Sequence, residues 1–353
     1  MNHKILLRKL SLCGVRGTPL KWFKDYLSGR EQYVALGDTV SEVCSIECGV
    51  PQGSILGPLL FLIFINDFPN SSNFFKFTLF ADDSTLSCKF EHSNVDLIKN
   101  ILTSELFNVY SWLSKNQIKL NSNKSTYLIH SYKKRISIPT IFIGPLQLKQ
   151  SNSVRFLGIM LDSSLSFKDH ILYLKNKLSK SVGILYKLKN YFPYAVMLKL
   201  YRALIEPYLR YAIEVWYGAP SYLTDQMSII QKKSIRAIHS LPYNAHTSNY
   251  FKHSNILKLE DLFKINICSH IFDALNSERH VFNEIICYHS EIHRHFTRNR
   301  NKLRLPQCFK TRTQSSFIYR SVSIWNELPL FIKQAKSTRI FKNRIKCTCI
   351  SLY

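Results

Sequence analysis

Two adjacent aspartates, Asp82 and Asp83, follow an apolar segment that begins at Phe74. Alternate positions of this segment are apolar, namely Phe75, Phe77, Leu79 and Ala81, and the positions between them include Lys76, Thr78 and Asp82. Such alternation predicts a β-strand with one buried face and places Asp82 on the accessible face. The alternation resumes after the aspartates with Leu86 and Cys88. The sequence therefore predicts a hairpin with a strand on each side of an acidic turn.

The paired carboxylates favour a cation as their partner. Two negative charges held side by side repel each other unless a cation bridges them, and carboxylate oxygens are good ligands for hard divalent ions. A hairpin with Asp82 and Asp83 at its turn is therefore a candidate metal site. The alternative is an ordinary polar turn, because aspartate is common in turns. Taken alone, the dipeptide favours that alternative.

A second motif, Gly49-Val50-Pro51-Gln52-Gly53-Ser54, lies upstream and runs into the apolar stretch Leu59 to Ile65. A glycine- and proline-rich loop that opens a helix exposes backbone N–H groups and lets another backbone approach closely. Ser54 can cap the helix and Pro58 is tolerated in its first turn. Asn66-Asp67, followed by Pro69, is expected to end the helix.

These two motifs, in this order and at this spacing, resemble the reverse transcriptases of jockey-like non-LTR retrotransposons. In that family a Gly-Val-Pro-Gln-Gly-Ser loop and a Phe-Ala-Asp-Asp hairpin are the most recognisable parts of the polymerase palm. The resemblance extends over most of the chain, through Leu10 to Gln32, Trp112, Asn116, Leu120-Asn121, Lys124, Phe156-Leu157-Gly158, Tyr201 to Tyr217, Gln231-Lys232-Lys233 with Arg236, and Ser323 to Pro329 with Phe341-Lys342.

The resemblance implies an α+β fold of the right-hand reverse transcriptase type. An incomplete palm is expected over residues 1–160, a mostly helical thumb-like region over residues 161–245 and a basic C-terminal region over residues 246–353. The family's activity is RNA-directed DNA polymerisation, and its partners are an RNA template, a DNA primer and deoxynucleotides. No membrane partner is implied, and the oligomeric state stays open.

Site residues carry over from the family by position. Asp82 and Asp83 would be catalytic ligands of Mg²⁺ or Mn²⁺, in a site that uses two ions. Lys124 would stand near the leaving pyrophosphate. Contact with the nucleotide and template is implied for Pro51, Gln52, Gly53, Phe80 and Ala81. The primer grip is implied for Phe156, Leu157 and Gly158.

One part of the family's metal site is not expected within this chain. The family's first catalytic aspartate precedes a segment that resembles Asn2 to Leu7, so we expect a C-terminal part that starts inside the palm and is catalytically incomplete. Three interpretations follow. The chain is a truncated reverse transcriptase, a non-catalytic nucleic-acid-binding remnant of a mobile element, or a relic without host function.

The charge of the chain indicates a polyanionic partner. Lys and Arg number 48 against 23 Asp and Glu, which gives a formal net charge of +25, and nucleic acid is the usual partner of such a chain. The longest apolar runs fall short of a membrane-spanning helix, and the N-terminus has no signal-peptide pattern. Nine cysteines without framework spacing are typical of a reducing compartment. We therefore expect an intracellular protein, in the nucleus or in a cytoplasmic ribonucleoprotein.

The pattern becomes helical near Asp169, where apolar residues recur three or four positions apart, at Ile171, Leu174, Leu178, Val182 and Leu185. A second helix is expected to start at Pro193. From Glu291 onward there are 14 Lys and Arg against two Glu, with aromatic residues between them that could stack on bases, namely Phe296, Phe309, Phe317, Tyr319 and Trp325. The alternative is a solvated basic face around an ordinary core.

Cysteines and histidines near the C-terminus are candidate zinc ligands, namely Cys287, His289, His293, His295, Cys347 and Cys349. Their spacing does not match a zinc finger or knuckle, which needs paired ligands across a loop. The sequence therefore disfavours a metal there.

Overall fold

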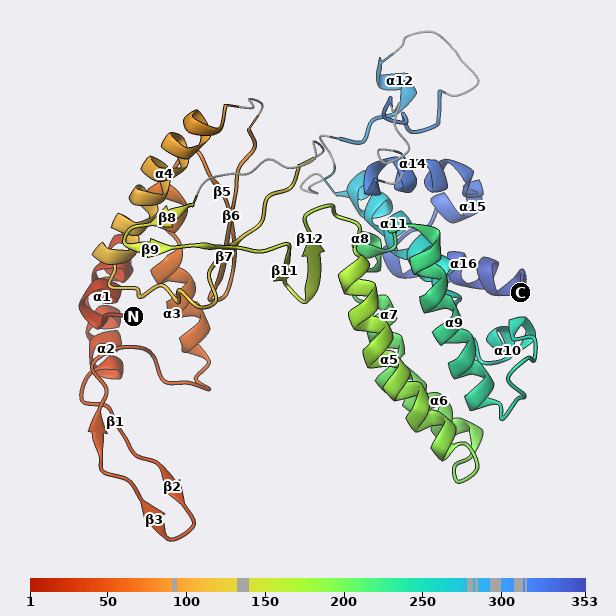
Figure 1. The fold of residues 1–353 in the computed structure, drawn as a ribbon, viewed down its shortest axis with the longest axis horizontal. Helices are drawn as coiled ribbons and strands as arrows, with labels where there is room; N and C mark the ends of the chain where they lie inside the picture. The colour runs from red at the N-terminus through yellow and green to blue at the C-terminus, as the bar shows by residue number, and fades with distance from the viewer. Residues whose placement is uncertain are drawn as a thin grey trace. The chain divides into compact units, whose positions relative to one another are not determined.

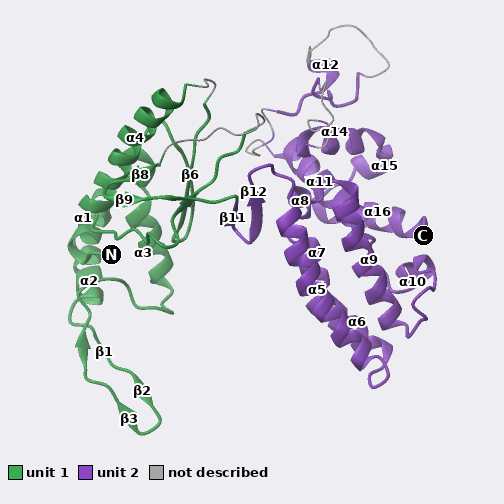
Figure 2. Ribbon diagram, in the orientation of Figure 1, with its two compact units in different colours: residues 1–152 green, residues 153–353 purple. Residues whose placement is uncertain are grey.

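The computed structural model forms two compact units, residues Met1–Asn152 and residues Ser153–Tyr353 (Figure 2). Within the part of the chain that the structure describes, no helix is long and apolar enough to cross a membrane. The described residues are 1–90, 94–131, 140–277, 282, 285–292, 300–307, 314 and 316–353.

Unit 1 combines helices with short antiparallel hairpins (Figure 1). One pairing, between β7 and β10, is parallel. The elements are α1 (His3–Leu12), α2 (Thr18–Leu27), β1 (Glu31–Gln32), β2 (Ala35–Leu36), β3 (Thr39–Val40), β4 (Cys44–Ser45), α3 (Leu56–Ile65), the 3₁₀ turn η1 (Phe68–Ser71), β5 (Lys76–Phe80), β6 (Asp83–Ser87), α4 (Val95–Lys115), β7 (Thr126–Tyr127), β8 (Phe142–Ile143), β9 (Leu146–Gln147) and β10 (Lys149–Gln150).

Helix α4 is the longest element of unit 1 and begins at a clear cap. The Asn94 side chain accepts hydrogen bonds from the backbone N–H groups of Asp96, at 3.1 Å, and Leu97, at 3.2 Å. These bonds satisfy two donors that a helix start leaves free. The helix buries one apolar stripe, formed by Ile98, Leu102, Leu106, Val109 and Leu113. This stripe packs with residues of α3, η1, β5 and β8 in one hydrophobic cluster, and a second cluster joins α1, α2 and α3.

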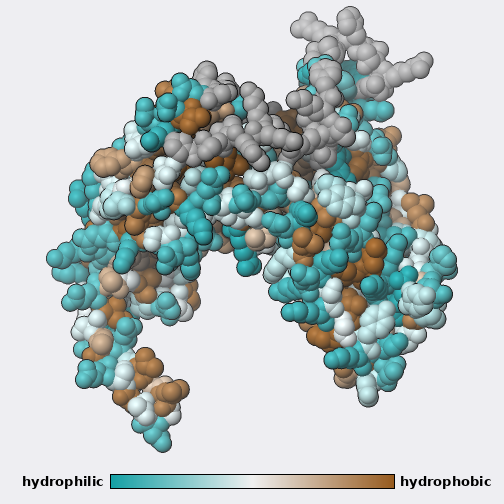
Figure 3. Space-filling model, in the orientation of Figure 1, coloured by the Kyte–Doolittle hydropathy of each residue, from teal (hydrophilic) through white to brown (hydrophobic). Residues whose placement is uncertain are grey.

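A ribbon of four short strands projects from unit 1 after α2. Strand β1 pairs with β4 and β2 pairs with β3, and Gly37, at φ +59°, lies in the turn between β2 and β3. Figure 1 shows the ribbon extending beyond the helices of its unit, and apolar side chains gather near its end (Figure 3). Leu36 is the most open of them, at 83% exposed. No residue from 31 to 75 is Lys or Arg, so this region differs in charge from the rest of the chain.

Unit 2 consists of one hairpin followed by helices, as the helical periodicity after Asp169 predicts. Its elements are β11 (Ser153–Phe156), β12 (Ile159–Asp162), α5 (Lys168–Leu188), α6 (Tyr194–Leu204), α7 (Glu206–Arg210), α8 (Ile213–Trp216), α9 (Ser221–Ile238), α10 (Ser248–His253), α11 (Leu259–Asn276), α12 (His289–Ile292), α14 (Phe317–Glu327), α15 (Leu330–Lys333) and α16 (Thr338–Ser351).

The helical prediction for α5 and α6 is confirmed. All five residues of the predicted stripe in α5 are buried, and Pro193 is the residue that precedes α6. One continuous core runs from Ile159 to Cys349, so the structure draws no division near residue 245 within this unit. The physical reason is that α11 packs against α8 and α9 as well as against α14 and α16.

The basic C-terminal region is only partly described. Phe296 and Phe309, and also His293 and His295, lie outside the described residues. Trp325 is 4% exposed and belongs to the core of unit 2, so it is not available as a stacking platform. Phe317 packs against the same core. For these two residues the structure favours the alternative of a basic face around an ordinary core.

Candidate active site

The predicted acidic hairpin is confirmed. Strands β5 and β6 pair antiparallel from Lys76 opposite Ser87 to Phe80 opposite Asp83, which leaves Ala81 and Asp82 as the two turn residues. Ala81 has φ +50°. This left-handed conformation costs a residue with a Cβ about 1 kcal/mol or more. The turn therefore stores local strain beside the two aspartates, and such strain is often found at functional sites.

One face of the hairpin fixes it to the core of unit 1. The Phe77 ring meets the Phe68 ring edge-on, with centroids 5.0 Å apart. Leu79 and Leu86 pack against the same cluster. The opposite face is open, and Phe80 is 63% exposed beside the aspartates. The alternation of the sequence therefore predicted correctly which face is buried and which is accessible.

Both carboxylates are exposed and, within the described residues, neither makes a hydrogen bond or an ion pair. Their oxygens are thus available as hard ligands, the donor type that Mg²⁺ prefers. Among the described residues, no group of three or more His, Cys, Asp or Glu side chains is placed to hold a metal ion. The chemistry of the donors fits a divalent cation, and the two aspartates supply part of a ligand set.

The segment from Gly49 to Ser54, called the Gln loop below, forms a tight turn before α3. The Ser54 N–H donates to the Pro51 carbonyl at 3.4 Å, and Gly53, at φ +79°, occupies the turn position that requires a left-handed residue. Gln52 is exposed at the corner of this turn. The Ser54 hydroxyl accepts from the Gly57 N–H at 3.0 Å, so the predicted helix cap is present.

The N-terminal residues hold the other end of this loop. The Gly49 N–H donates to the Met1 carbonyl at 2.7 Å, and the Gly49 carbonyl lies 2.8 Å from Nε2 of His3. Asn2 forms an isolated antiparallel bridge with Cys48, and its side chain donates to Gln117 at 2.9 Å. The loop that carries Gln52 is therefore anchored at both ends.

Lys124 lies in a turn whose N–H groups bond back to Asn121. Its side chain is exposed, and no hydrogen bond among the described residues joins it to Asp82, Asp83 or Gln52. Gln52, Asp82 and Lys124 are thus exposed on ordered turns, and each turn is fixed by its own backbone contacts. The catalytic role of Lys124 stays a prediction.

An ion pair in unit 1, between Lys9 and Asp67, was not predicted from the sequence. The Lys9 ammonium lies 2.5 Å from Oδ1 of Asp67 and donates to the Phe64 carbonyl at 2.6 Å. It also lies 4.7 Å from the ring centroids of Phe64 and Trp112. Trp112 Nε1 donates to Asp67 at 3.4 Å. These contacts join α1, the end of α3 and α4, and no local sequence pattern links residues so far apart.

The predicted primer-grip residues form the turn of the β11–β12 hairpin in unit 2. Phe156 pairs with Ile159, and the turn residues Leu157 and Gly158 have φ +44° and +86°. The Tyr211 hydroxyl donates to the Leu157 carbonyl at 2.5 Å. A Cβ on Gly158 would lie 3.2 Å from the Tyr211 ring. Both the backbone angle and this close contact therefore require glycine at this position.

Two buried side chains connect β12 to the start of α5. Burial alone would raise the pKa of the Asp162 carboxyl, but hydrogen bonds from Ser164, Ser166 and Phe167 outweigh it and hold that pKa below its usual value. His170 lies in α5, and its Nδ1 is 3.4 Å from the Met160 N–H, the geometry of an acceptor. Burial lowers the pKa of His170 to about 4, so this imidazole is neutral near pH 7.

Comparison with known proteins agrees with this geometry. Residues 1–161 match the family described as reverse transcriptase (RNA-dependent DNA polymerase). The probable RNA-directed DNA polymerase from transposon X-element of Drosophila melanogaster is 28% identical over 312 residues, which cover 84% of this chain and 32% of that protein. The RNA-directed DNA polymerase from mobile element jockey is 27% identical in Drosophila funebris, over 64% of this chain and 25% of that protein. The Drosophila melanogaster jockey protein is 24% identical, over 72% of this chain and 28% of that protein.

Residues 1–161, which contain the acidic hairpin and the Gln loop, match the reverse transcriptase family. This family has the right-hand polymerase fold and generally uses divalent metal ions. The chain as a whole is similar to the jockey-like reverse transcriptases of non-LTR retrotransposons. It spans between a quarter and a third of the length of these three relatives.

Proposed function

We propose that this chain contributes metal-binding carboxylates to the catalytic centre of an RNA-directed DNA polymerase, with an RNA template, a DNA primer and deoxynucleotides as substrates. The observation that carries the proposal is the pair of exposed carboxylates, without a partner among the described residues, at the tip of a hairpin whose other face packs against the core of unit 1. The names of the relatives, all RNA-directed DNA polymerases of mobile elements, support it.

Asp82 and Asp83 would hold Mg²⁺ or Mn²⁺. When bound, two such ions activate the primer hydroxyl and stabilise the triphosphate. The strained turn at Ala81 and the packing of the half-buried Phe77 ring limit the motion of the carboxylates, which keeps the ligand oxygens in place before the substrate arrives. The hairpin therefore holds the two carboxylates in a preorganised position for metal binding.

The remaining site residues would position the substrates. Gln52 and Gly53 stand on a turn with an open surface, where a nucleotide and its templating base can approach the backbone. The exposed ring of Phe80 adds apolar contact area next to the aspartates. Lys124 would neutralise charge on the leaving pyrophosphate, and Phe156 to Gly158 would support the primer strand.

We further propose that residues 1–353 alone do not extend a primer. Two carboxylates supply only part of a two-ion site, and the described residues do not provide a third ligand beside them. If the missing ligand raises the barrier by about 5 kcal/mol, the rate falls by more than ~1,000-fold. A nucleic-acid-binding remnant is the second candidate function, and the net charge of +25 favours it.

Manganese binding tests the ligand assignment without any need for catalysis. Residues 1–353 are titrated with Mn²⁺ alone and free ion is followed by electron paramagnetic resonance. The double variant Asp82→Asn/Asp83→Asn should lose the tightest class of bound Mn²⁺. The matched control Asp38→Asn/Asp96→Asn removes two exposed carboxylates elsewhere in unit 1 and should retain it. Equal binding by the two double variants would contradict the assignment.

A further inference from the structure

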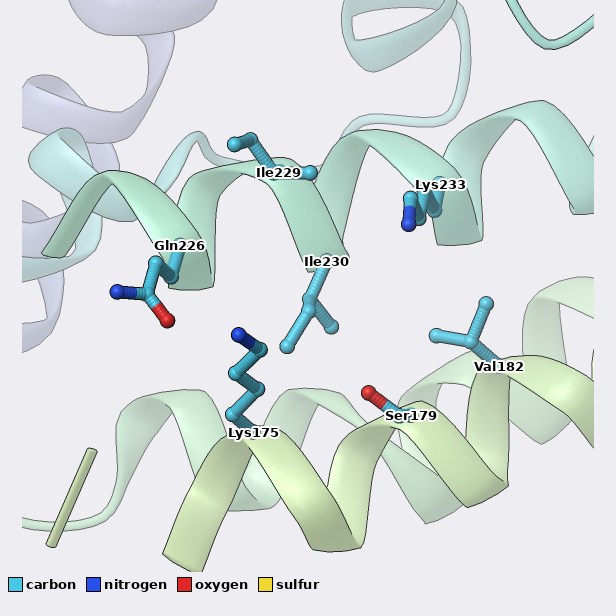
Figure 4. A pocket seen from close by; sticks show the side chains of 7 residues that line it. All are labelled: Lys175, Ser179, Val182, Gln226, Ile229, Ile230 and Lys233. Atoms are coloured by element: carbon cyan, nitrogen blue, oxygen red, sulfur yellow. The ribbon is translucent and has the colours of Figure 1, made fainter. Parts of the chain in front are cut away.

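One ammonium group of unit 1 lies largely inside the protein. The Lys9 side chain is 13% exposed, its Nζ lies 2.5 Å from Oδ1 of Asp67, and it donates to the Phe64 carbonyl at 2.6 Å. The lysines that line the groove between α5 and α9 in unit 2, Lys175 and Lys233, are instead exposed (Figure 4). Burial of an ammonium costs free energy unless the group is paired and hydrogen-bonded. Lys9 is therefore held in place by partners that a surface lysine does not need.

The Asp67 carboxylate joins two helices. Its Oδ1 accepts from Lys9 on α1, and its Oδ2 accepts from Nε1 of Trp112 on α4 at 3.4 Å. The Lys9 ammonium also lies 4.7 Å from the Trp112 ring centroid, within the range of a cation–π interaction. Both oxygens of this carboxylate thus have partners, and α1 and α4 are tied to the residue that immediately precedes η1.

Phe68 connects Asp67 to the acidic hairpin. It is the next residue along the chain, is 3% exposed, and packs against the Trp112 ring at a centroid distance of 4.6 Å. Its other neighbour is the Phe77 ring, at 5.0 Å. Phe77 belongs to β5, the strand that leads to Asp82. A displacement of Asp67 would therefore move the ring against which the hairpin rests.

The start of the hairpin is fixed by a second set of contacts. The Ser72 hydroxyl donates to Glu105 of α4 at 2.5 Å and accepts from the Phe74 N–H at 3.2 Å. Ser72 is 6% exposed. The hairpin is thus attached to the helices of unit 1 near its base, whereas its tip is open. A small shift of the contacts at the base is then carried to the carboxylates at the tip.

We propose that Lys9 is a positioning residue for the two aspartates of the acidic hairpin. Its ammonium holds the Asp67 carboxylate, which places Phe68 against Phe77 of β5. Metal affinity depends on how closely the ligand oxygens are held in the geometry of the bound ion. Lys9 acts only through these contacts. This inference rests on the proposed metal role of the hairpin and adds a residue that sets the position of its ligands.

Mn²⁺ binding to residues 1–353 tests this role. Free Mn²⁺ is followed by electron paramagnetic resonance, and the substitution is Lys9→Met, which keeps an unbranched side chain and removes the ammonium. The matched control is Lys4→Met, which removes the same charge from an exposed position of the same helix. Circular dichroism confirms that both variants are folded at the temperature of the titration.

The sign of the change separates positioning from charge. Removal of a positive charge favours cation binding through Coulomb attraction, so Lys4→Met should bind Mn²⁺ as tightly as the wild type or slightly more tightly. Outer partners of metal ligands change metal affinity by about 10- to 100-fold. Because Lys9 acts through intervening residues, Lys9→Met should weaken the tightest class of bound Mn²⁺ by about three- to tenfold. Unchanged or tighter binding by Lys9→Met would overturn the proposal.

A second substitution decides the question if Lys9→Met does not fold. Trp112→Phe removes the indole N–H that holds the other oxygen of Asp67 and keeps an aromatic ring beside Phe68. It should weaken Mn²⁺ binding in the same direction as Lys9→Met. Binding by Trp112→Phe at the wild-type affinity would count against the positioning role.

A destabilising control separates position from general stability. Leu27→Ala removes a buried side chain of α2 from the cluster of α1, α2 and α3, so it should lower stability and leave Mn²⁺ affinity unchanged. An equal loss of Mn²⁺ affinity by Leu27→Ala and Lys9→Met would show a general effect of stability and would overturn the proposal.

Failure of the metal role itself gives a different result. If Asp82→Asn/Asp83→Asn retains the tightest class of bound Mn²⁺, the hairpin is not the Mn²⁺ site, and both the proposed function and this inference are contradicted. If that double variant loses this class and Lys9→Met binds it at the wild-type affinity, only the positioning role is contradicted.

Discussion

Gly158 and Gly183 illustrate how backbone context decides the effect of one methyl group. Gly158 has φ +86° and lies against the Tyr211 ring, whereas Gly183 lies in α5 with open space around it. We expect Gly158→Ala to lower the free energy of unfolding by about 1–2 kcal/mol, because the new Cβ meets both an unfavourable angle and a close contact.

The matched change Gly183→Ala should raise that free energy by about 0.5–1 kcal/mol, since alanine is the better helix former. Urea unfolding followed by circular dichroism measures both variants. Equal effects of the two substitutions would show that the β11–β12 turn does not have the described geometry.

Asp162 predicts how the stability of unit 2 depends on pH. The folded state holds the pKa of this carboxyl below its unfolded value. Its stabilisation is therefore present above the unfolded pKa of about 3.9 and is lost as pH falls through the folded pKa. Asp162→Asn should cost about 1.5–3 kcal/mol at pH 7, because a charged acceptor of several hydrogen bonds is removed. The cost should shrink below pH 4. A cost that is the same at pH 7 and pH 3 in urea unfolding experiments would argue against this role.

The β5–β6 hairpin shows how far an element can be predicted from its sequence. The period of two in Phe75 to Ala81, with its resumption at Leu86 and Cys88, was enough to place both strands, the turn and the inward face, because strand geometry fixes side-chain direction locally. The same holds for the apolar stripe of α5.

Contacts between distant segments could not be predicted in this way. The Lys9–Asp67 pair, the Tyr211 bond to Leu157 and the burial of Trp325 depend on tertiary packing, and no local period encodes them. The mutual placement of Asp82, Gln52 and Lys124 stays an expectation from the family for the same reason.

Two phenylalanines of β5 lie on opposite faces of the hairpin, Phe77 against the core and Phe80 on the exposed face. Phe77→Ala should lower the free energy of unfolding of unit 1 by about 2–4 kcal/mol, because it removes the ring that packs against Phe68. Phe80→Ala should have an effect within about ±0.5 kcal/mol, since that side chain is largely exposed. Thermal unfolding of the two variants tests this difference. A larger loss from Phe80→Ala would mean that the faces are reversed.

The net charge of the whole chain determines how its RNA binding should depend on salt. With a net charge of +25, the chain should bind RNA at low salt, and the affinity should fall steeply as salt rises, because each phosphate contact releases counterions. A titration of labelled RNA between about 50 and about 200 mM salt should show a fall of two orders of magnitude or more if about six phosphates are contacted. Binding that is indifferent to salt would contradict this account.

The polymerase assignment is tested most directly by primer extension in a chimera. The part of the X-element polymerase that precedes its matched region is joined to residues 1–353 and assayed on an RNA template with a DNA primer, deoxynucleotides and Mg²⁺ or Mn²⁺. The account predicts extension by the chimera, loss of at least ~1,000-fold with Asp82→Asn, and background activity for residues 1–353 alone. Extension by the Asp82→Asn chimera at the unsubstituted rate would contradict the central claim that the Asp82–Asp83 hairpin carries part of the polymerase metal site.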